Sequence, residues 1–283
     1  MDYVPPAEMV ADAVNAAEKK SKLSARDLLI RGVLSGVFLG YATSLALTAN
    51  SQGLPAIVGA LIFPVGFVML VLLGFELVTG NFALLPMAWM DGRVGFPELL
   101  RNWSWVFLGN LAGSVLYGYL FYITITNFGS GNGGALGELV RQAAIKKTTA
   151  YAAMGAGGWI TAFVKAILCN WMVTVGTMLA FASRSTAGKV LAMWLPITTF
   201  FAHGYEHSVV NMFLIPTGML LHAPVSMSQW WIWNQIPVTL GNIAGGALCT
   251  GAALWLTHSA TREPAVAEGD AAIAVVRTKA VGR

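Results

Sequence analysis

Charged residues are scarce in this chain. Only 11% of its 283 residues are Asp, Glu, Lys or Arg, against roughly 25% in an average soluble domain. Hydrophobic residues make up 56% of the sequence, and the mean hydropathy is +0.65. This composition excludes an ordinary soluble protein and predicts a polytopic protein embedded in a lipid bilayer. The net charge of +4 does not indicate nucleic-acid binding, because the basic residues cluster near the ends of apolar segments.

Cysteine is almost absent. Cys169 and Cys249 both lie within apolar segments, so we interpret them as small buried hydrophobic residues and not as a disulfide or a metal site. The N-terminus lacks the short apolar core of a signal peptide, so we expect no cleavage. No metal or other cofactor is expected.

Long apolar runs are abundant. Six can be delimited, at residues 28–49, 56–86, 103–127, 155–183, 190–221 and 230–257. A helix needs about 20 residues to cross a bilayer. The second and fifth runs are longer and contain Gly, Pro and acidic residues, so we expect each to be broken. The sequence therefore predicts an all-α integral membrane protein with a six-helix domain at 28–258.

The two ends of the chain are polar. Residues 1–27 are expected to form a cytoplasmic amphipathic segment, because Pro5 and Pro6 suit a helix start and Val10, Val14 and Ala17 share one face. Residues 259–283 are expected to form a flexible cytoplasmic tail. Six spans put both termini on the same side of the membrane, and the segments on that side carry 12 Lys and Arg residues. The segments on the other side carry only Arg141, Lys146 and Lys147, so the positive-inside rule predicts that both termini are cytoplasmic.

The chain contains an internal repeat. Residues 74–81 (GFELVTGN) correspond to residues 204–211 (GYEHSVVN), and residues 108–113 (LGNLAG) correspond to residues 240–245 (LGNIAG). Each half holds three spans, and an odd number means that the second copy is inserted upside down. The Gly-x-x-x-Gly spacings at 36–40, 109–113 and 241–245 are expected to pack helices within one chain.

Polar residues coincide with the two predicted breaks. An isolated ionisable group at this depth costs about 3 kcal/mol on insertion scales, and broken backbone is tolerated there only where it is buried or lines a cavity. Inverted repeats with matching breaks are typical of a substrate pathway near the membrane midplane. We expect the breaks near Thr79 and Ser208 to face each other across a pore. A duplicated scaffold without a transport role is the alternative.

Two runs carry a family resemblance. Residues 201–212 (FAHGYEHSVVNM) and 165–173 (KAILCNWMV) resemble the formate/nitrite transporter family. The continuation at 211–216 (NMFLIP) is most similar to the formate-channel branch. This resemblance implies an aquaporin-like six-helix protomer, assembly as a homopentamer with one pore in each protomer, and a place in the inner (cytoplasmic) membrane of the cell.

The resemblance also assigns residues by position. His207, Thr79 and Asn170 would surround the substrate. The constriction positions are Leu77, Val78, Phe63 and Phe200. One position departs from the family, because Met154 stands where a vestibule lysine is usual. The charges that could replace it are Lys165, Lys146 and Lys147.

The implied substrate is formate or a similar small monovalent weak-acid anion. An anion loses its hydration at an apolar constriction at large cost, whereas a weak acid can take up a proton and cross in neutral form. The imidazole of His207 can donate a hydrogen bond and exchange a proton near neutral pH. Glu206, Asn211, Glu76 and Asn81 are expected to hold the broken helices without touching the substrate. Nitrite and hydrosulfide remain alternatives within the family.

An intramembrane zinc hydrolase is a more distant alternative. His203, Glu206 and His207 satisfy the H-x-x-E-H pattern of inverted zinc proteases. That pattern needs a third ligand, and every acidic residue after Glu206 lies in the tail, at Glu263, Glu268 and Asp270. We therefore expect no enzyme and interpret His203 as structural.

Overall fold

The computed structural model describes residues 2–259. These residues form helices joined by short connections, apart from an isolated bridge between Tyr3 and Ser183. Four helical stretches within them are long and apolar enough to cross a membrane. Three are the helices α2 (Ala25–Ser51), α6 (Phe96–Thr126) and α9 (Ala156–Leu179). The fourth is composite and consists of α12 (Met227–Trp230), the π-helical turn η1 (Trp231–Gln235), α13 (Ile236–Ala244), a second π-helical turn η2 (Gly245–Ala252) and α14 (Ala253–His258).

The two remaining spans are broken, as the sequence predicted. One consists of α3 (Ala56–Ile62), α4 (Pro64–Leu72) and α5 (Val78–Met90). The other consists of α10 (Thr186–Ala202) and α11 (Ser208–Leu220). Both breaks have the same backbone form: Gly74 and Gly204 adopt φ of +69° and +64°, and Leu77 and His207 are extended at φ −112° and −111°. A residue with a Cβ atom would be strained at either glycine.

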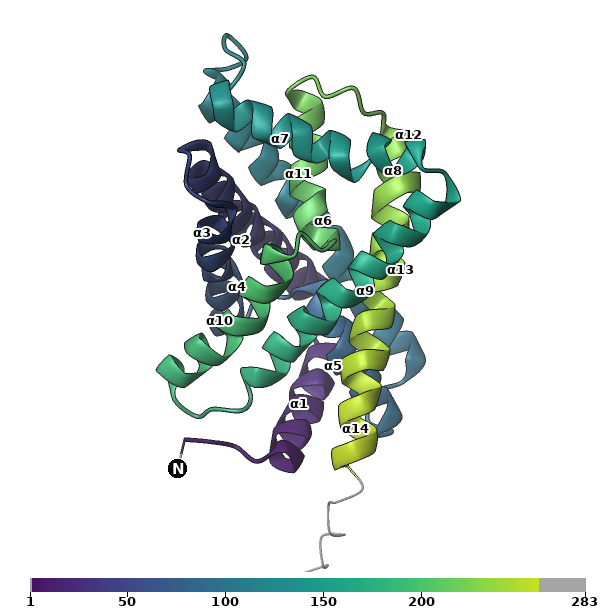
Figure 1. Cartoon of the computed structure of the whole chain (residues 1–283). Helices are drawn as coiled ribbons and strands as arrows, with labels where there is room; N and C mark the ends of the chain where they lie inside the picture. The colour runs from purple at the N-terminus through teal and green to yellow at the C-terminus, as the bar shows by residue number, and fades with distance from the viewer. Residues whose placement is uncertain (1, 260–283) are drawn as a thin grey trace, which may run out of the picture.

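The two halves of the chain are related by inversion. Figure 1 shows α1 (Pro6–Ser21) at one end of the bundle, and α7 (Gly134–Lys147) and α8 (Thr149–Ala153) at the opposite end. The helix pair α2 and α6 in the first half corresponds to α9 and α13 in the second. A Cβ atom on Gly113 would lie 1.9 Å from the Val33 carbonyl oxygen, and one on Gly245 would lie 2.3 Å from that of Ile167. The glycine motifs thus pack helices inside one chain, which confirms the prediction.

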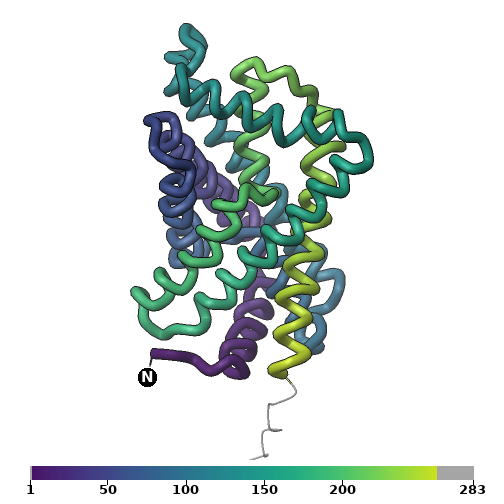
Figure 2. Tube along the Cα trace, in the orientation of Figure 1, coloured from purple at the N-terminus to yellow at the C-terminus, as the bar shows by residue number. Residues whose placement is uncertain are grey.

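Helix α1 docks on the membrane domain through its apolar face. Val10, Val14 and Ala17 are fully buried in a cluster that includes Leu84 and Leu85 of α5. The helix lies at the same end of the molecule as α14, as Figure 2 shows. The predicted tail at 259–283 falls outside the described residues, apart from Ser259.

Candidate functional site

The N-terminal ends of α5 and α11 meet at the centre of the bundle. The Thr79 hydroxyl Oγ1 lies 3.1 Å from the His207 Nε2 atom, and the two residues are 0% and 2% exposed. Both helices point their N-termini at this contact, so the positive ends of their dipoles converge on it. The two breaks therefore face each other, as the repeat predicted.

The hydrogen bonds of His207 fix its tautomer. The backbone N–H of Val210 donates to the His207 Nδ1 atom at 3.2 Å, so His207 caps α11 with its own ring. A ring nitrogen that accepts carries no hydrogen, and in neutral imidazole the other nitrogen then does. His207 therefore donates from Nε2 to the Thr79 hydroxyl, and the hydroxyl hydrogen of Thr79 remains available for a further acceptor.

Asn170 completes this centre from α9. Its amide nitrogen Nδ2 donates to the Thr79 carbonyl at 3.0 Å and to the Asn242 carbonyl at 2.6 Å. The residue is fully buried. The structure thus brings together the three residues that the sequence proposed around a substrate, namely His207, Thr79 and Asn170.

A matched network of carboxylates and amides holds each break. Asn81 donates to Glu76 at 2.8 Å and to Asn102 at 2.9 Å. In the other half, Asn211 donates to Glu206 at 2.8 Å and to Asn234 at 2.9 Å. Sequence reasoning proposed the glutamates and Asn81 and Asn211 but missed Asn102 and Asn234. Their spacing of 132 residues, the same as that of the LGN motifs, could have revealed them.

Each break glutamate also binds a lysine. The Lys20 ammonium lies 2.6 Å from Glu76 Oε1, and the Lys147 ammonium lies 2.8 Å from Glu206 Oε2. The pair at Glu206 has an additional donor, because the Tyr151 hydroxyl donates to Glu206 Oε1 at 2.8 Å. The sequence proposed Lys147 as a vestibule charge, but its charge is balanced by Glu206. Lys20 was not proposed at all.

Two further asparagines tie the breaks to neighbouring helices. The Asn110 side-chain oxygen accepts from the Val78 N–H at 2.9 Å, and that of Asn242 accepts from the Ser208 N–H at 2.9 Å. Their amide groups donate to two carbonyls each. These are the asparagines of the repeated LGN motif, and they supply partners for helix-end N–H groups that would otherwise be buried unpaired.

A cavity opens on each side of the centre. One, of about 270 Å³, is lined by Leu77, Lys20 and Lys189 among others and lies toward α1. We call it the inner vestibule, a name that marks the α1 end of the protein. The other, of about 300 Å³, is lined by His207, Phe200 and three lysines and lies toward α7 and α8. We call it the outer vestibule, and its lysines are Lys146, Lys147 and Lys165.

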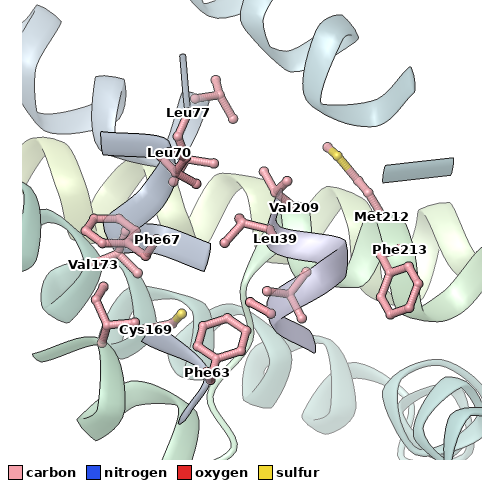
Figure 3. Close-up of a cluster of buried hydrophobic side chains, with 14 of the residues drawn as sticks. Leu39, Phe63, Phe67, Leu70, Leu77, Cys169, Val173, Val209, Met212 and Phe213 are labelled. Atoms are coloured by element: carbon pink, nitrogen blue, oxygen red, sulfur yellow. The ribbon is translucent and has the colours of Figure 1, made fainter. Parts of the chain in front are cut away.

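The proposed constriction residues occupy different positions. Leu77 lines the inner vestibule and Phe200 the outer one; Figure 3 shows Leu77 beside Leu70 and Phe67 in the buried cluster. Phe63 packs against two other aromatic rings: its ring centroid lies 5.6 Å from that of Phe200 and 4.0 Å from that of Phe201. Among the described cavities, Val78 lines only a separate groove between α5, α6 and α13. Val78 thus lines neither vestibule, and its place at a constriction stays a prediction.

Lys165, Met154 and His203, the remaining residues that the sequence analysis considered, lie outside the contact between Thr79 and His207. Lys165 lies over the Tyr151 ring, 5.9 Å from its centroid, while Met154 is 58% exposed. His203 is exposed and places its Nδ1 atom 2.8 Å from the Thr199 carbonyl oxygen. Within residues 2–259, no group of three or more His, Cys, Asp or Glu side chains could hold a metal ion.

Comparison with known proteins assigns the family. The sequence profile described as "Formate/nitrite transporter" matches residues 7–256. The chain belongs to the formate/nitrite transporter family. It is 36% identical over 272 residues to a "Probable formate transporter" of Methanothermobacter thermautotrophicus, covering 89% of this chain and 96% of that protein. It is 32% identical to the "Formate channel FocA" of Haemophilus influenzae, covering 87% of this chain and 92% of that protein.

Solved structures of this family share the fold. An "FNT family ion channel" superposes with a TM-score of 0.76 at 26% identity, over 88% of this chain and 98% of that one. A "Pentameric formate channel with formate bound" gives a TM-score of 0.67 at 26% identity, over 83% and 97% of the two chains. The chain thus has the aquaporin-like fold of these channels and is a multi-pass membrane channel or transporter, not an enzyme.

Proposed function

We propose that this protein passes formate, or a similar small monovalent weak-acid anion with a proton, across the cytoplasmic membrane. We further propose that it works as a homopentamer with one pore in each protomer and with both termini in the cytoplasm. The contact between Thr79 and His207, buried between two lysine-lined vestibules, is the observation that carries this proposal. Formate channels and transporters among its relatives support the choice of substrate.

The lysines of the two vestibules support a substrate that is an anion before it reaches the contact between Thr79 and His207. Lysines that line a cavity raise the local concentration of anions, and both vestibules have them. Lys20 and Lys147 are balanced by glutamates, which leaves Lys189 on the inner side and Lys146 and Lys165 on the outer side as the attracting charges. The last two would serve in place of the vestibule lysine that Met154 replaces.

The centre itself favours a neutral species. Leu77 and Phe200 border it on opposite sides, and a bare anion passing between such side chains loses its hydration. A weak acid avoids this cost by crossing in its protonated form. In place of the proton exchange at His207 that the sequence suggested, we propose that the acid takes its proton from water in the vestibule that it enters and releases it on the far side, because both ring nitrogens of His207 are engaged in hydrogen bonds. His207 then polarises the acid through Thr79, while Glu206, Asn211, Glu76 and Asn81 keep the two half-helices in place.

Flux measurements in proteoliposomes test the proposal. Radiolabelled formate should enter vesicles that contain the wild-type protein, and His207→Phe should abolish this flux while the oligomer still assembles. Wild-type flux from that variant would remove His207 from the pathway, and no formate flux from the wild type would refute the function. Competition by nitrite and by hydrosulfide, at two pH values, decides between formate and the alternatives within the family.

A further inference from the structure

The groove between α5, α6 and α13 is separate from both vestibules. It encloses about 410 Å³ and is lined by apolar side chains apart from Ser104 and Thr239. Leu100 and Leu108 of α6 also line it and are 43% and 49% exposed, so the groove opens on the lateral surface of the bundle. Because α6 is long and apolar enough to cross a bilayer, this surface lies within the depth of the membrane.

The wall of the groove is held in place by the core of the protein. Trp103 packs edge-on against Phe82, with ring centroids 4.9 Å apart at an interplanar angle of 81°. Its indole Nε1 donates to the Asn81 carbonyl at 3.1 Å, and Asn81 in turn binds Glu76 at the break between α4 and α5. The groove is therefore preformed, which lowers the entropic cost of binding a molecule there.

The two halves of the protein differ at this groove. Three apolar wall residues have polar counterparts in the inverted repeat, the pairs being Val78 and Ser208, Trp103 and Gln235, and Phe107 and Thr239. The Gln235 amide donates to the hydroxyls of Ser208 and Thr239 at 2.7 and 3.2 Å, and these hydroxyls are 2.9 Å apart. The apolar wall thus belongs to the half of the membrane that carries α1.

The groove has the depth of one lipid leaflet. Asn110 of α6 accepts from the Val78 N–H at the helix break, which places Asn110 near the bilayer midplane. Arg101 precedes it by nine residues, roughly 14 Å along the helix axis. Half of the hydrocarbon core of a bilayer measures about 15 Å. Arg101 therefore stands at the level of the lipid headgroups on the α1 side, and the groove extends from there to the midplane.

Arg101 supplies a positive charge at the headgroup end of the groove. It lies on the same stripe of α6 as Ser104 and Leu108, at spacings of three and four residues. Its guanidinium donates to the Leu23 carbonyl at 3.0 Å. Within residues 2–259 it takes part in no ion pair. Since no carboxylate balances this charge, it complements an anionic headgroup.

We propose that the groove binds one acyl chain of an anionic phospholipid from the leaflet on the α1 side, with the lipid phosphate paired to Arg101. The chain lies against Trp103 and Phe107 and reaches the level of Thr239 near the midplane. An apolar wall one leaflet deep, with an unbalanced arginine at headgroup level, matches the two ends of such a lipid. The site is separate from the pore, so it does not depend on which substrate is transported.

Native mass spectrometry of the protein in detergent tests the site. The protein is titrated with dioleoylphosphatidylglycerol and with dioleoylphosphatidylcholine, which have the same chains and differ in net headgroup charge. The wild type should bind the anionic lipid more tightly. Arg101→Gln should weaken this binding about fivefold, as expected for one basic residue at a membrane surface, and should leave binding of phosphatidylcholine unchanged. Ser104→Trp, which fills the groove, should abolish tight binding of both lipids.

Two matched variants serve as controls. Arg26→Gln removes an exposed positive charge near the α1 end of α2, and Ile236→Trp enlarges the inverted counterpart of Ser104. Both should bind lipid as the wild type does. An equal loss in Arg26→Gln and Arg101→Gln would overturn the proposal, as would wild-type affinity in Ser104→Trp. A smaller oligomer of folded Ser104→Trp in size-exclusion chromatography, with Ile236→Trp unaffected, would show that a second copy of the chain covers the groove and would also overturn it.

Discussion

Lys20 and Lys147 make the same two contacts in opposite halves of the protein. Each ammonium binds the glutamate of a helix break, at 2.6 and 2.8 Å. Each backbone carbonyl accepts from an asparagine amide, that of Lys20 from Asn102 and that of Lys147 from Asn234. The inverted repeat therefore includes α1 and α7 as well as the three spans of each half. Helix α1 belongs to the pore architecture and is not an appendage.

The outer lysine should be needed for stability. Lys147→Gln leaves Glu206 buried without its counter-charge; the two side chains are 17% and 3% exposed. Removing one partner of a buried ion pair costs about 3–5 kcal/mol, so the thermal unfolding temperature in detergent should fall. The additional change Glu206→Gln should restore part of the loss. Lys22→Gln, which breaks an exposed pair with Glu18, serves as the control and should leave the unfolding temperature nearly unchanged.

The aromatic wall of the outer vestibule should set the size limit of the pore. Phe200 packs against Phe63 and His207 at centroid distances of 5.6 Å each. Phe200→Ala removes that wall, and uptake of acetate and lactate relative to formate should rise severalfold. Phe107→Ala shortens an aromatic side chain in the separate groove between α5, α6 and α13 and should leave this ratio unchanged. An unaltered ratio in Phe200→Ala would show that the constriction lies elsewhere.

Docking of α1 should withstand mild acid. Glu18 on α1 has a lowered pKa because it accepts a hydrogen bond from Lys22, with Arg93 adding to the effect. A carboxylate with a depressed pKa contributes stability above its unfolded pKa, near 4.3, and loses it only as the pH falls through the folded value. A spin label on Lys19→Cys, in a Cys249→Ala background, should report constant mobility between pH 7 and 5. Increased mobility already at pH 6 would contradict this prediction.

The sequence was informative where the repeat preserves both residue type and spacing. The two breaks could be located to within about two residues, because glycine, glutamate and asparagine recur 130 positions apart. The roles of Glu76 and Glu206 as acceptors also follow from this pattern. His207, Thr79 and Asn170 were found by their resemblance to a family and are brought together by contacts that spacing alone does not fix.

Other features depended on three-dimensional packing. The sequence comparison did not align Lys20 with Lys147, because the two lysines precede their glutamates by different numbers of residues, 56 and 59. The segments that connect lysine and glutamate therefore differ in length between the two halves. Of the neighbouring residues Leu77 and Val78, Leu77 lines the inner vestibule and Val78 lines the groove between α5, α6 and α13, a division that the sequence does not reveal. The tautomer of His207 depends on the N–H of Val210, which no sequence pattern reveals.

The central claim is that the substrate crosses as a neutral acid, and one measurement tests it most directly. Formate uptake into proteoliposomes is recorded together with lumenal pH, with and without a potassium diffusion potential of 100 mV. A neutral acid releases its proton inside, so the lumen should acidify in proportion to uptake, and the potential should have no effect. Such a potential is worth about 2.3 kcal/mol for each transferred charge, roughly 50-fold in the accumulation ratio. Uptake that follows the potential without acidification would show that formate crosses as the anion and would contradict the account.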